Sequence, residues 1–554
     1  MKRRCTVFLL AAVLGGCLAS PRLAGAQCVP GREYRQSDAV RARYPDPPVR
    51  FATPAFARGK TDFTSHSEMM QFVQSLARAS STVRVRIIGE SQEGRALPLL
   101  VFSDARDAEP AALRRLERPI VFLVGQVHGN EPASGEAMLA VAHALALGEL
   151  KALLDRVTVV ILPRANPDGA HYFWRATANC IDVNRDHVKV DLPETAALRR
   201  VANEYLPDVF VDAHEFSVAA RWIEKFGKLQ SYDFTMQYAT HPNVPVALTD
   251  LSERLFRRNL IGSVDAAGYS HFWYYTTGYN LKDKRVSMGG TAPDIGRNYA
   301  GLQNAISFLI ETRGVGIGRD SYARRVHTHY VVLASLLRTA AENAALVVKT
   351  VRDARADVVR RGRAPEPDDM IAVTTKSPLT RQKLTMMDPD SGEPGEVEVE
   401  WSDSLGVSAG LARQRPFAYL MLPSYGDVAR RLMLSGIEVR RLRQAVELEV
   451  ERYEVVERRA GGVFAEGHLR SSVTTEMATR TRRFPAGSYL YPMGQPGANI
   501  LALALEPESP SSFVNLGLVP TDARGRANPQ EGGPSEVPVF RVMRPVELDA
   551  ASAR

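Results

Sequence analysis

Between about residues 62 and 320 the sequence alternates between patterns typical of helices and of strands. The stretch 65–79 places apolar residues on one helical face, and 83–89 with 97–102 predicts a hairpin. The stretch 119–127 is an almost continuous apolar run, as expected of a central strand that is covered on both faces. The alternation continues at 136–147, 157–162, 194–205, 209–213 and 303–310. We therefore expect an α/β fold with a mixed, mostly parallel sheet covered by helices on both faces.

The C-terminal part of the chain has a different character. A helical stretch at 322–361 is followed by a Pro- and Asp-rich segment, and the rest alternates short strand-like runs with Gly- and Pro-rich turns. The strand-like runs lie at 447–455, 488–491, 500–504 and 537–542, and one helix is expected at 425–436. A chain of 554 residues exceeds what one hydrophobic core usually supports. We predict a signal peptide (1–26), a catalytic domain (27–363), a linker (364–369) and a β-rich accessory domain (370–554).

The N-terminus has the composition of a leader sequence. Three basic residues at 2–4 precede an apolar stretch at 6–18, and Ala24-Gly25-Ala26 fits a cleavage site. This pattern predicts a secreted or periplasmic protein. As an alternative, Leu14-Gly15-Gly16-Cys17 resembles a lipobox, which predicts a lipid anchor at Cys17.

The charge pattern of the mature chain does not indicate a nucleic-acid partner, and its hydropathy does not indicate a transmembrane span. The leader carries four of the positive charges that make up the formal +8, so the mature chain is left with +4. Because the sequence has no basic stripe with interleaved aromatic residues, we expect no nucleic-acid partner. After the leader no apolar run is long enough for a transmembrane span.

Cysteine usage limits the kind of metal site that is possible. Two of the four cysteines lie in the leader, so Cys28 and Cys180 remain in the mature chain. They could form a disulfide in an oxidising compartment, although the sequence does not show that they meet. Any metal must therefore be held mainly by histidine and carboxylate side chains.

Two short motifs carry such side chains at strand ends. His128-Gly129-Asn130-Glu131 follows the run at 119–127, and Asp212-Ala213-His214-Glu215 ends the run at 209–213. Alternation along a strand places Asp212 and His214 on the same face. Two imidazoles, one carboxylate and an open position are typical of catalytic zinc. Taken singly, the first motif could be a polar turn and the second a surface histidine.

Three further features supply groups for binding and proton transfer. Arg175 and the pair Asn184-Arg185 could hold a carboxylate or face an oxyanion. Glu311, after the apolar run Phe308-Leu309-Ile310, could accept a proton from an activated water and deliver it to a leaving amine. Alone, each could also be a charged loop or a solvent-facing acid.

In this order, the motifs resemble those of the zinc metallocarboxypeptidases of the carboxypeptidase A/B type, over roughly residues 65–314. The chain looks like a secreted bacterial member of that family with an extra β-rich domain. The resemblance implies one Zn²⁺ per chain, a zinc hydrolase fold and a set of residue roles. It assigns zinc binding to His128, Glu131 and His214, oxyanion stabilisation to Arg175, and general base and acid catalysis to Glu311. It also assigns the grip on the substrate's terminal carboxylate to Asn184 and Arg185, and the orientation of the first zinc histidine to Asp182.

Two positions depart from the family pattern. Cys180 stands where the family usually has glycine, where it could tighten the loop or join it to Cys28. The family's substrate-capping tyrosine precedes a Gly-Gly pair, but here Arg285 stands near that position. Tyr279 or Tyr299 are the candidates to replace it.

The predicted function is therefore hydrolysis of the C-terminal peptide bond of peptides or proteins that carry a free C-terminal carboxylate. One alternative keeps the zinc and changes the substrate: an amidase, a deacylase or a hydrolase that trims peptidoglycan peptides. Another alternative is a non-catalytic protein that binds peptides or glycans on the same scaffold.

Overall fold

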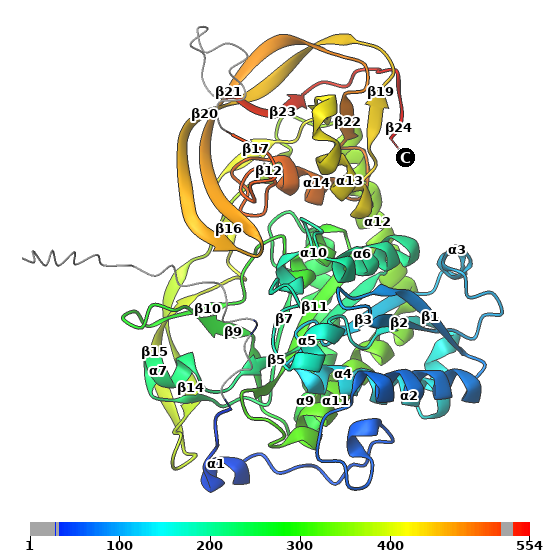
Figure 1. The fold of residues 1–554 in the computed structure, drawn as a ribbon, viewed down its shortest axis with the longest axis vertical. Helices are drawn as coiled ribbons and strands as arrows, with labels where there is room; N and C mark the ends of the chain where they lie inside the picture. Colours follow the sequence, from blue (N-terminus) through cyan, green and yellow to red (C-terminus); the bar gives the residue numbers. More distant parts are fainter. Residues whose placement is uncertain (1–27, 29–32, 522–535, 554) are drawn as a thin grey trace, which may run out of the picture.

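The computed structural model describes residues 28, 33–521 and 536–553 (Figure 1), without the side chains of 460–465. The predicted signal peptide and the alternative lipid anchor at Cys17 lie outside the described residues. The helix predicted at 65–79 is α2 (His66–Ala79). It begins with a capping box, since the Ser65 hydroxyl accepts from the Glu68 backbone N–H and the Glu68 carboxylate accepts from that of Ser65.

An eight-stranded sheet forms the centre of the N-terminal part, in the order β1-β2-β4-β3-β5-β11-β7-β8. Its strands are β1 (Val83–Glu90), β2 (Ala96–Phe102), β3 (Ile120–Gly125), β4 (Thr158–Leu162), β5 (Val209–Ser217), β7 (Phe234–Tyr238), β8 (His271–Trp273) and β11 (Ile306–Val315). Four of the seven strand pairings are parallel and three are antiparallel. The expected mixed sheet and the β1–β2 hairpin are confirmed.

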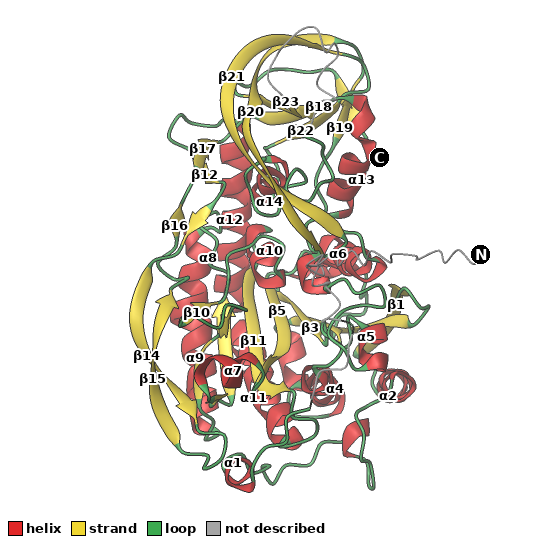
Figure 2. Ribbon diagram, turned by 60° about the vertical axis from the view of Figure 1, so that its left-hand side comes forward, coloured by secondary structure: helices red, strands yellow, loops and turns green. Residues whose placement is uncertain are grey.

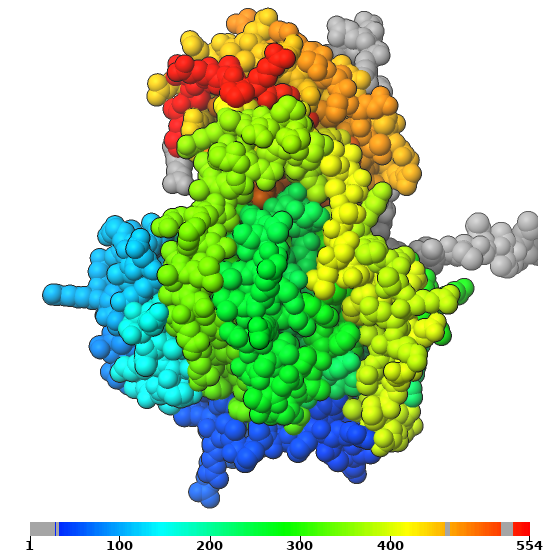
Figure 3. Space-filling model, turned by 180° about the vertical axis from the view of Figure 1, so that it is seen from behind, coloured from blue at the N-terminus to red at the C-terminus, as the bar shows by residue number. Residues whose placement is uncertain are grey.

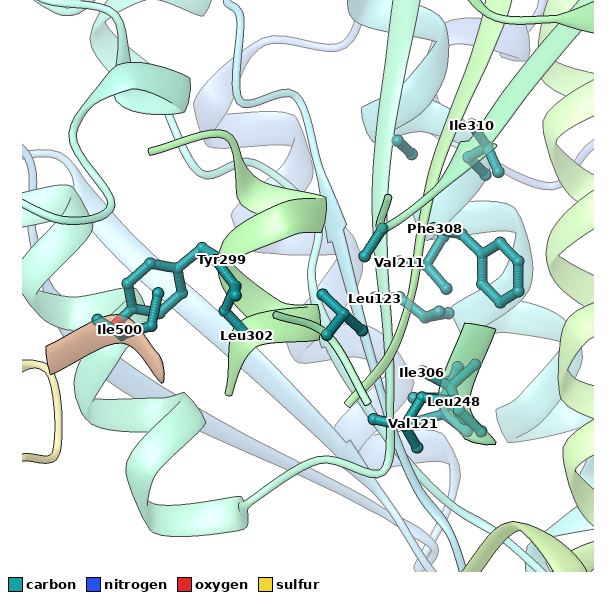
Figure 4. Close-up of a cluster of buried hydrophobic side chains, with 14 of the residues drawn as sticks. Val121, Leu123, Val211, Leu248, Tyr299, Leu302, Ile306, Phe308, Ile310 and Ile500 are labelled. Atoms are coloured by element: carbon teal, nitrogen blue, oxygen red, sulfur yellow. The ribbon is translucent and has the colours of Figure 1, made fainter. Parts of the chain in front are cut away.

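Both faces of this sheet are covered, because alternate residues of each strand enter different clusters. On one face, Val211, Phe308 and Ile310 belong to a cluster with residues of α2, α4 (Pro132–Leu147), α9 (Arg258–Ala266) and α11 (Tyr322–Glu342). Figure 4 shows these three side chains with other members of the cluster. On the other face, Phe122 and Phe210 pack against α6 (Pro193–Tyr205). Because side chains alternate along a strand, Glu311 points away from the face of Phe308 and Ile310, and His214 points away from the face of Val211. Both therefore lie on the α6 face.

Several element boundaries differ from those expected from the sequence. The strands β5 and β11 do not end where their apolar runs end, because the parallel pairing continues from Ile306–Val209 to Val315–Ser217. His214 and Glu311 therefore lie within strands. The run at 500–504 was expected to be a strand, but it belongs to the helix α14 (Ala498–Leu505). Its alanines and leucines are all buried, so it has no alternation, and these residues are strong helix formers.

The helical stretch expected at 322–361 is two helices, α11 and α12 (Ala344–Arg363), which meet at an angle of 84° around Asn343. Among the described residues no single helix is long and apolar enough to cross a membrane. Taken together, α11 and α12 are long and apolar enough to cross a membrane, judged by length and composition only. In the structure α11 packs against α4 and α9.

The segment after α12 returns to the N-terminal part before it forms a separate sheet. The strands β14 (Leu379–Met387) and β15 (Pro394–Ser402) join β6 (Leu229–Gln230), β9 (Tyr275–Thr277) and β10 (Arg285–Met288) in a five-stranded sheet. In Figure 3 this yellow-green segment lies along the flank of the green part. The predicted boundary at residue 370 therefore does not coincide with a break between sheets, and the division into domains stays a prediction.

A seven-stranded sheet forms the C-terminal end of the molecule, in the order β21-β20-β23-β18-β22-β19-β24 (Figure 2). Its strands are β18 (Ala418–Met421), β19 (Arg440–Leu442), β20 (Val446–Ala465), β21 (His468–Phe484), β22 (Tyr489–Pro492), β23 (Glu536–Val542) and β24 (Ala550–Ser552). The helix expected at 425–436 is α13 (Gly426–Leu434). This region also contains α14, which packs against α12 and α10 (Gly296–Leu302).

Candidate metal centre and active site

The loop 128–131 connects the end of β3 to the start of α4 and is fixed by close packing. Pro132 is the first residue of α4, a position that needs no backbone N–H. A Cβ atom on Gly129 would lie 1.9 Å from the carbonyl carbon of Gly169, so no side chain fits there. The Gly129 N–H also donates to the carbonyl of Arg175 (3.2 Å). This packing directs His128 and Glu131 into the protein.

His128, Glu131 and His214 converge on one buried point, although 83 residues separate the second from the third. Their candidate ligand atoms all lie within 4.8 Å of one another. The Glu131 carboxylate oxygens lie 2.7 Å from His128 Nδ1 and 2.9 Å from His214 Nδ1, and the two Nδ1 atoms are 3.0 Å apart. Each of these residues is at most 3% exposed. Two imidazoles and a carboxylate that face one another away from water require a cation or a proton between them, and this donor set suits zinc.

The far nitrogen of each histidine contacts a carboxylate. His128 Nε2 lies 3.1 Å from Asp182 Oδ1, and His214 Nε2 lies 2.9 Å from Asp212 Oδ1. Such partners fix the orientation and tautomer of metal-binding histidines. The resemblance implied this role for Asp182. It did not assign one to Asp212, although the alternation Asp212-Ala213-His214 placed both side chains on one face.

The surroundings of His214 favour positive charge at this point. Burial lowers the pKa of His214, but Asp212 and Glu131 raise it by more, so that it lies well above its usual value. Because zinc binds the unprotonated nitrogen, a metal and a proton would compete for His214.

Glu311 lies beside this cluster on the neighbouring strand. It is the register partner of His214 in the β5–β11 pairing, and it is 6% exposed. Burial and then the charge of Glu131 raise the pKa of Glu311 to about 8, although His214 and Arg175 lower it. A carboxyl group whose pKa lies near neutrality is suited to both accepting and donating a proton.

Arg175 faces the same cluster and is held by Asp182. Its Nε and Nη2 atoms donate to Asp182 Oδ2 (3.0 and 2.9 Å), and Nη1 lies 3.6 Å from Glu131 Oε1. Its side chain is 35% exposed, so the guanidinium borders open space next to the candidate ligands. Asp182 therefore joins His128 to Arg175.

Asn184 and Arg185 follow Asp182 in a short 3₁₀ turn. The Asn184 N–H donates to Asp182 Oδ1 (2.7 Å), and its side-chain oxygen accepts from the Gly296 N–H (2.6 Å). The Arg185 guanidinium donates to the carbonyl of Asn184 (2.7 Å). The structure thus brings together all eight residues that the sequence singled out.

Comparison with known proteins identifies the fold family. A family model described as "Zinc carboxypeptidase" matches residues 69–345. The chain is 32% identical over 472 residues to "Carboxypeptidase 2" of Trichophyton rubrum. This match covers 84% of this chain and 86% of that protein. The chain belongs to the zinc carboxypeptidase family.

The chain is also similar to a second fungal protein and, over part of its length, to solved structures. "Carboxypeptidase 2" of Trichophyton tonsurans is 31% identical over 492 residues, which is 88% of either chain. Among solved structures, a metallo-carboxypeptidase from Burkholderia cenocepacia gives a TM-score of 0.39 at 18% identity, over 50% of this chain and 69% of that one. The relatives with long matches are fungal, so a bacterial source is not confirmed. Membership of the zinc carboxypeptidase family does not favour the amidase or deacylase alternative.

The two tyrosines considered as substitutes for the family's capping tyrosine contact arginines that are not among the predicted site residues. Tyr279 is 79% exposed and stacks on Arg221, and Tyr299 is buried beneath Arg199. Tyr274, which the sequence did not single out, is buried within electrostatic reach of Glu311 and Arg175. Burial and the negative charge of Glu311 raise the pKa of the Tyr274 hydroxyl. No motif marks Tyr274 in the sequence, because a Trp-Tyr-Tyr run is equally typical of a buried strand.

The loop that carries Asp182 and Asn184 is braced by a disulfide. Cys28 and Cys180 are bonded, with their Cα atoms 5.4 Å apart and 152 positions between them in the sequence. The bond joins the N-terminal segment to the turn that precedes Asp182. The sequence left this pairing open.

Loss of this disulfide is expected to destabilise the protein. Replacing both cysteines by serine (C28S/C180S) should lower the free energy of unfolding by about 2–4 kcal/mol, because the unfolded chain regains the freedom that a cross-link over a long loop removes. Urea unfolding followed by tryptophan fluorescence measures the change. Reductant should destabilise the wild type to the same extent and leave the variant unchanged; equal unfolding midpoints for both proteins would contradict the prediction.

Proposed function

We propose that this zinc carboxypeptidase removes single residues from the C-terminal ends of peptides, with His128, Glu131 and His214 as the zinc ligands. The observation that carries the proposal is the convergence of these three side chains beside Glu311 and Arg175. When bound, zinc supplies Lewis acidity and neutralises negative charge that develops in the reaction.

The other groups take roles that follow from their places. Glu311 accepts a proton from the attacking water and returns it to the departing amine. Arg175, aimed at the cluster by Asp182, donates to the carbonyl oxygen as negative charge develops on it. Asn184 and Arg185 hold the terminal carboxylate of the substrate through charge-assisted hydrogen bonds.

We also propose that the protein is exported from the cytoplasm, to the periplasm or the medium. The leader-like composition of residues 1–26 supports export. The Cys28–Cys180 disulfide supports it independently, because such bonds persist mainly in oxidising compartments.

A pair of substrates tests the proposed reaction. A short peptide with a free C-terminal carboxylate should be hydrolysed at least about 100-fold faster than its C-terminal amide, measured as kcat/KM by mass spectrometry of the products. The amide leaves the Arg185 charge without its partner, which costs binding of the transition state.

A variant shows whether Arg185 causes this preference. Arg185→Ala should lower kcat/KM on the free acid much more than on the amide, so that the ratio of the two values falls. Equal rates of the wild type on both substrates would rule out recognition of a terminal carboxylate and would favour an amidase.

A further inference from the structure

The hairpin formed by β20 and β21 is much longer than the sheet to which it belongs. Its strands are 20 and 17 residues long, but among the residues that the structure describes β20 pairs with the next strand, β23, over residues 451–454. Figure 2 shows the remainder as a two-stranded arm that runs from the C-terminal sheet down to α6 and α10. The turn at Glu466-Gly467 forms its tip.

Three residues at the tip of this arm, among those whose side chains the structure describes, make polar contacts with the N-terminal part. The Glu466 carboxylate accepts from the backbone N–H of Asp182 (2.7 Å). His468 Nε2 lies 2.6 Å from Asp191 Oδ2, and a guanidinium nitrogen of Arg470 lies 3.6 Å from Asp294 Oδ2. These contacts bridge more than 170 positions of sequence.

The turn is also packed closely against the loop that it contacts. Gly467 has a φ of +80°, and a Cβ atom placed there would lie 3.0 Å from Ile181 Cδ1. Only glycine adopts this conformation without strain in so small a space. The arm therefore rests directly on the residue that precedes Asp182.

Asp182 is the residue through which such a contact would reach the reacting groups. Its side chain contacts both His128 and Arg175, and its Oδ1 also accepts from the Asn184 N–H. Glu466 supplies the bond to the backbone of this same residue. Anchoring that backbone limits the movement of Arg175 relative to the candidate ligands.

The third contact involves a buried carboxylate that interacts with Arg185. Asp294 is 4% exposed, and the positive charges that act on it most strongly are those of Arg185 and Arg470. It stands two residues before Gly296, whose N–H is bonded to Asn184. The arm thus spans from the loop at Asp182 to the segment that supports the carboxylate-binding pair.

We propose that the tip of the β20–β21 arm is a structural part of the active site. In this proposal Glu466 is a positioning residue for Asp182 and Arg175, and Arg470 is a positioning residue that acts on Arg185 through Asp294. The C-terminal region would then be required for turnover and not only for stability. This inference rests on the proposed function, because it assigns roles within the same site.

The two contacts predict different kinetic effects. Glu466→Ala should lower kcat about tenfold with a small change in KM, because displacement of Arg175 affects the transition state most. Arg470→Ala should raise KM several-fold with a small change in kcat, because Arg185 holds the bound substrate. Both are measured on a peptide with a free C-terminal carboxylate.

Glu466→Gln and Glu457→Gln serve as matched variants. The glutamine oxygen at 466 can still accept from the Asp182 N–H, so this variant should recover most of kcat. Glu457 lies on the same arm with Arg459 as its partner, and its replacement should change neither constant. Zinc content and the melting temperature should stay at the wild-type values in all four variants.

The outcomes separate this proposal from the proposed function. A wild-type protein without activity on the peptide overturns the proposed function. Wild-type activity with an unchanged kcat in Glu466→Ala overturns the role of the arm, as does a loss of kcat accompanied by loss of zinc or of folded protein.

Discussion

Glu311→Gln is expected to lower kcat by about 10³-fold while KM and zinc content change little. General acid–base catalysis by a positioned side chain is typically worth 10²–10⁴-fold. The glutamine has nearly the same shape, but its amide can neither take a proton from water nor return one to an amine. Steady-state kinetics on a free-acid peptide, with zinc measured by mass spectrometry, tests this expectation.

The position of Glu311 explains why the loss should be large. The parallel register places it beside His214 on the α6 face, while its neighbours Phe308 and Ile310 pack into the opposite face. Burial raises its pKa to about 8, and each positive charge added beside it lowers the pKa. A cation bound beside it would therefore favour the carboxylate form, which is the form that accepts a proton from water.

A surface substitution of the same kind provides the control. Glu396 forms an exposed ion pair with Lys383, far from the site, so Glu396→Gln should retain wild-type kcat. If Glu311→Gln keeps near-normal turnover with intact zinc content, another group carries the proton and the assignment is wrong.

The sequence predicted the candidate ligands through two signals together, the local pattern at strand ends and the resemblance to a known family. A nearly unbroken apolar run identifies a central strand, and polar residues next to the end of such a strand have few structural reasons to be there. His128 and Glu131 follow β3 in this way. That β5 and β11 lie side by side could not be read from the sequence, yet this pairing brings His214 next to Glu311.

The features that the sequence did not reveal depend on contacts between distant segments. The carboxylate of Glu466 reaches Asp182 across 284 positions, and no periodicity reports such a contact. The strands β14 and β15 look like the start of a separate module, but their partners are β6 and β10 of the N-terminal part. The run at 500–504 was misassigned because a fully buried short segment has no alternation that separates helix from strand.

The other large effect is expected from the loss of one of the three proposed zinc ligands. His214→Ala should reduce bound zinc from one per chain to nearly none at low free zinc, with activity falling in parallel, because two of three ligands remain. A chelator should abolish the activity of the wild type, and added zinc should restore it. His271→Ala is a matched control, since His271 contacts Asp265 outside the cluster.

The carboxylate partner of His214 provides an intermediate case. Asp212→Asn keeps the ligand but weakens its orientation, and substitutions of this kind typically cost 10–100-fold in metal affinity. The three proteins should therefore rank wild type, Asp212→Asn, His214→Ala in zinc affinity. A His214→Ala protein that retains one tightly bound zinc would show that the metal is held elsewhere.

The same site should release a proton when zinc binds. Burial lowers the pKa of His214, but Asp212 and Glu131 raise it well above its usual value, so the metal-free protein is protonated there at neutral pH. Zinc requires the unprotonated nitrogen, and its apparent affinity should consequently fall as the pH falls. Calorimetric titration of metal-free protein in buffers of different ionisation enthalpy measures the released protons. We expect the wild type to release about one proton per bound zinc near neutral pH, and zinc binding without proton release would contradict a role for His214 as the protonated partner in the empty cluster.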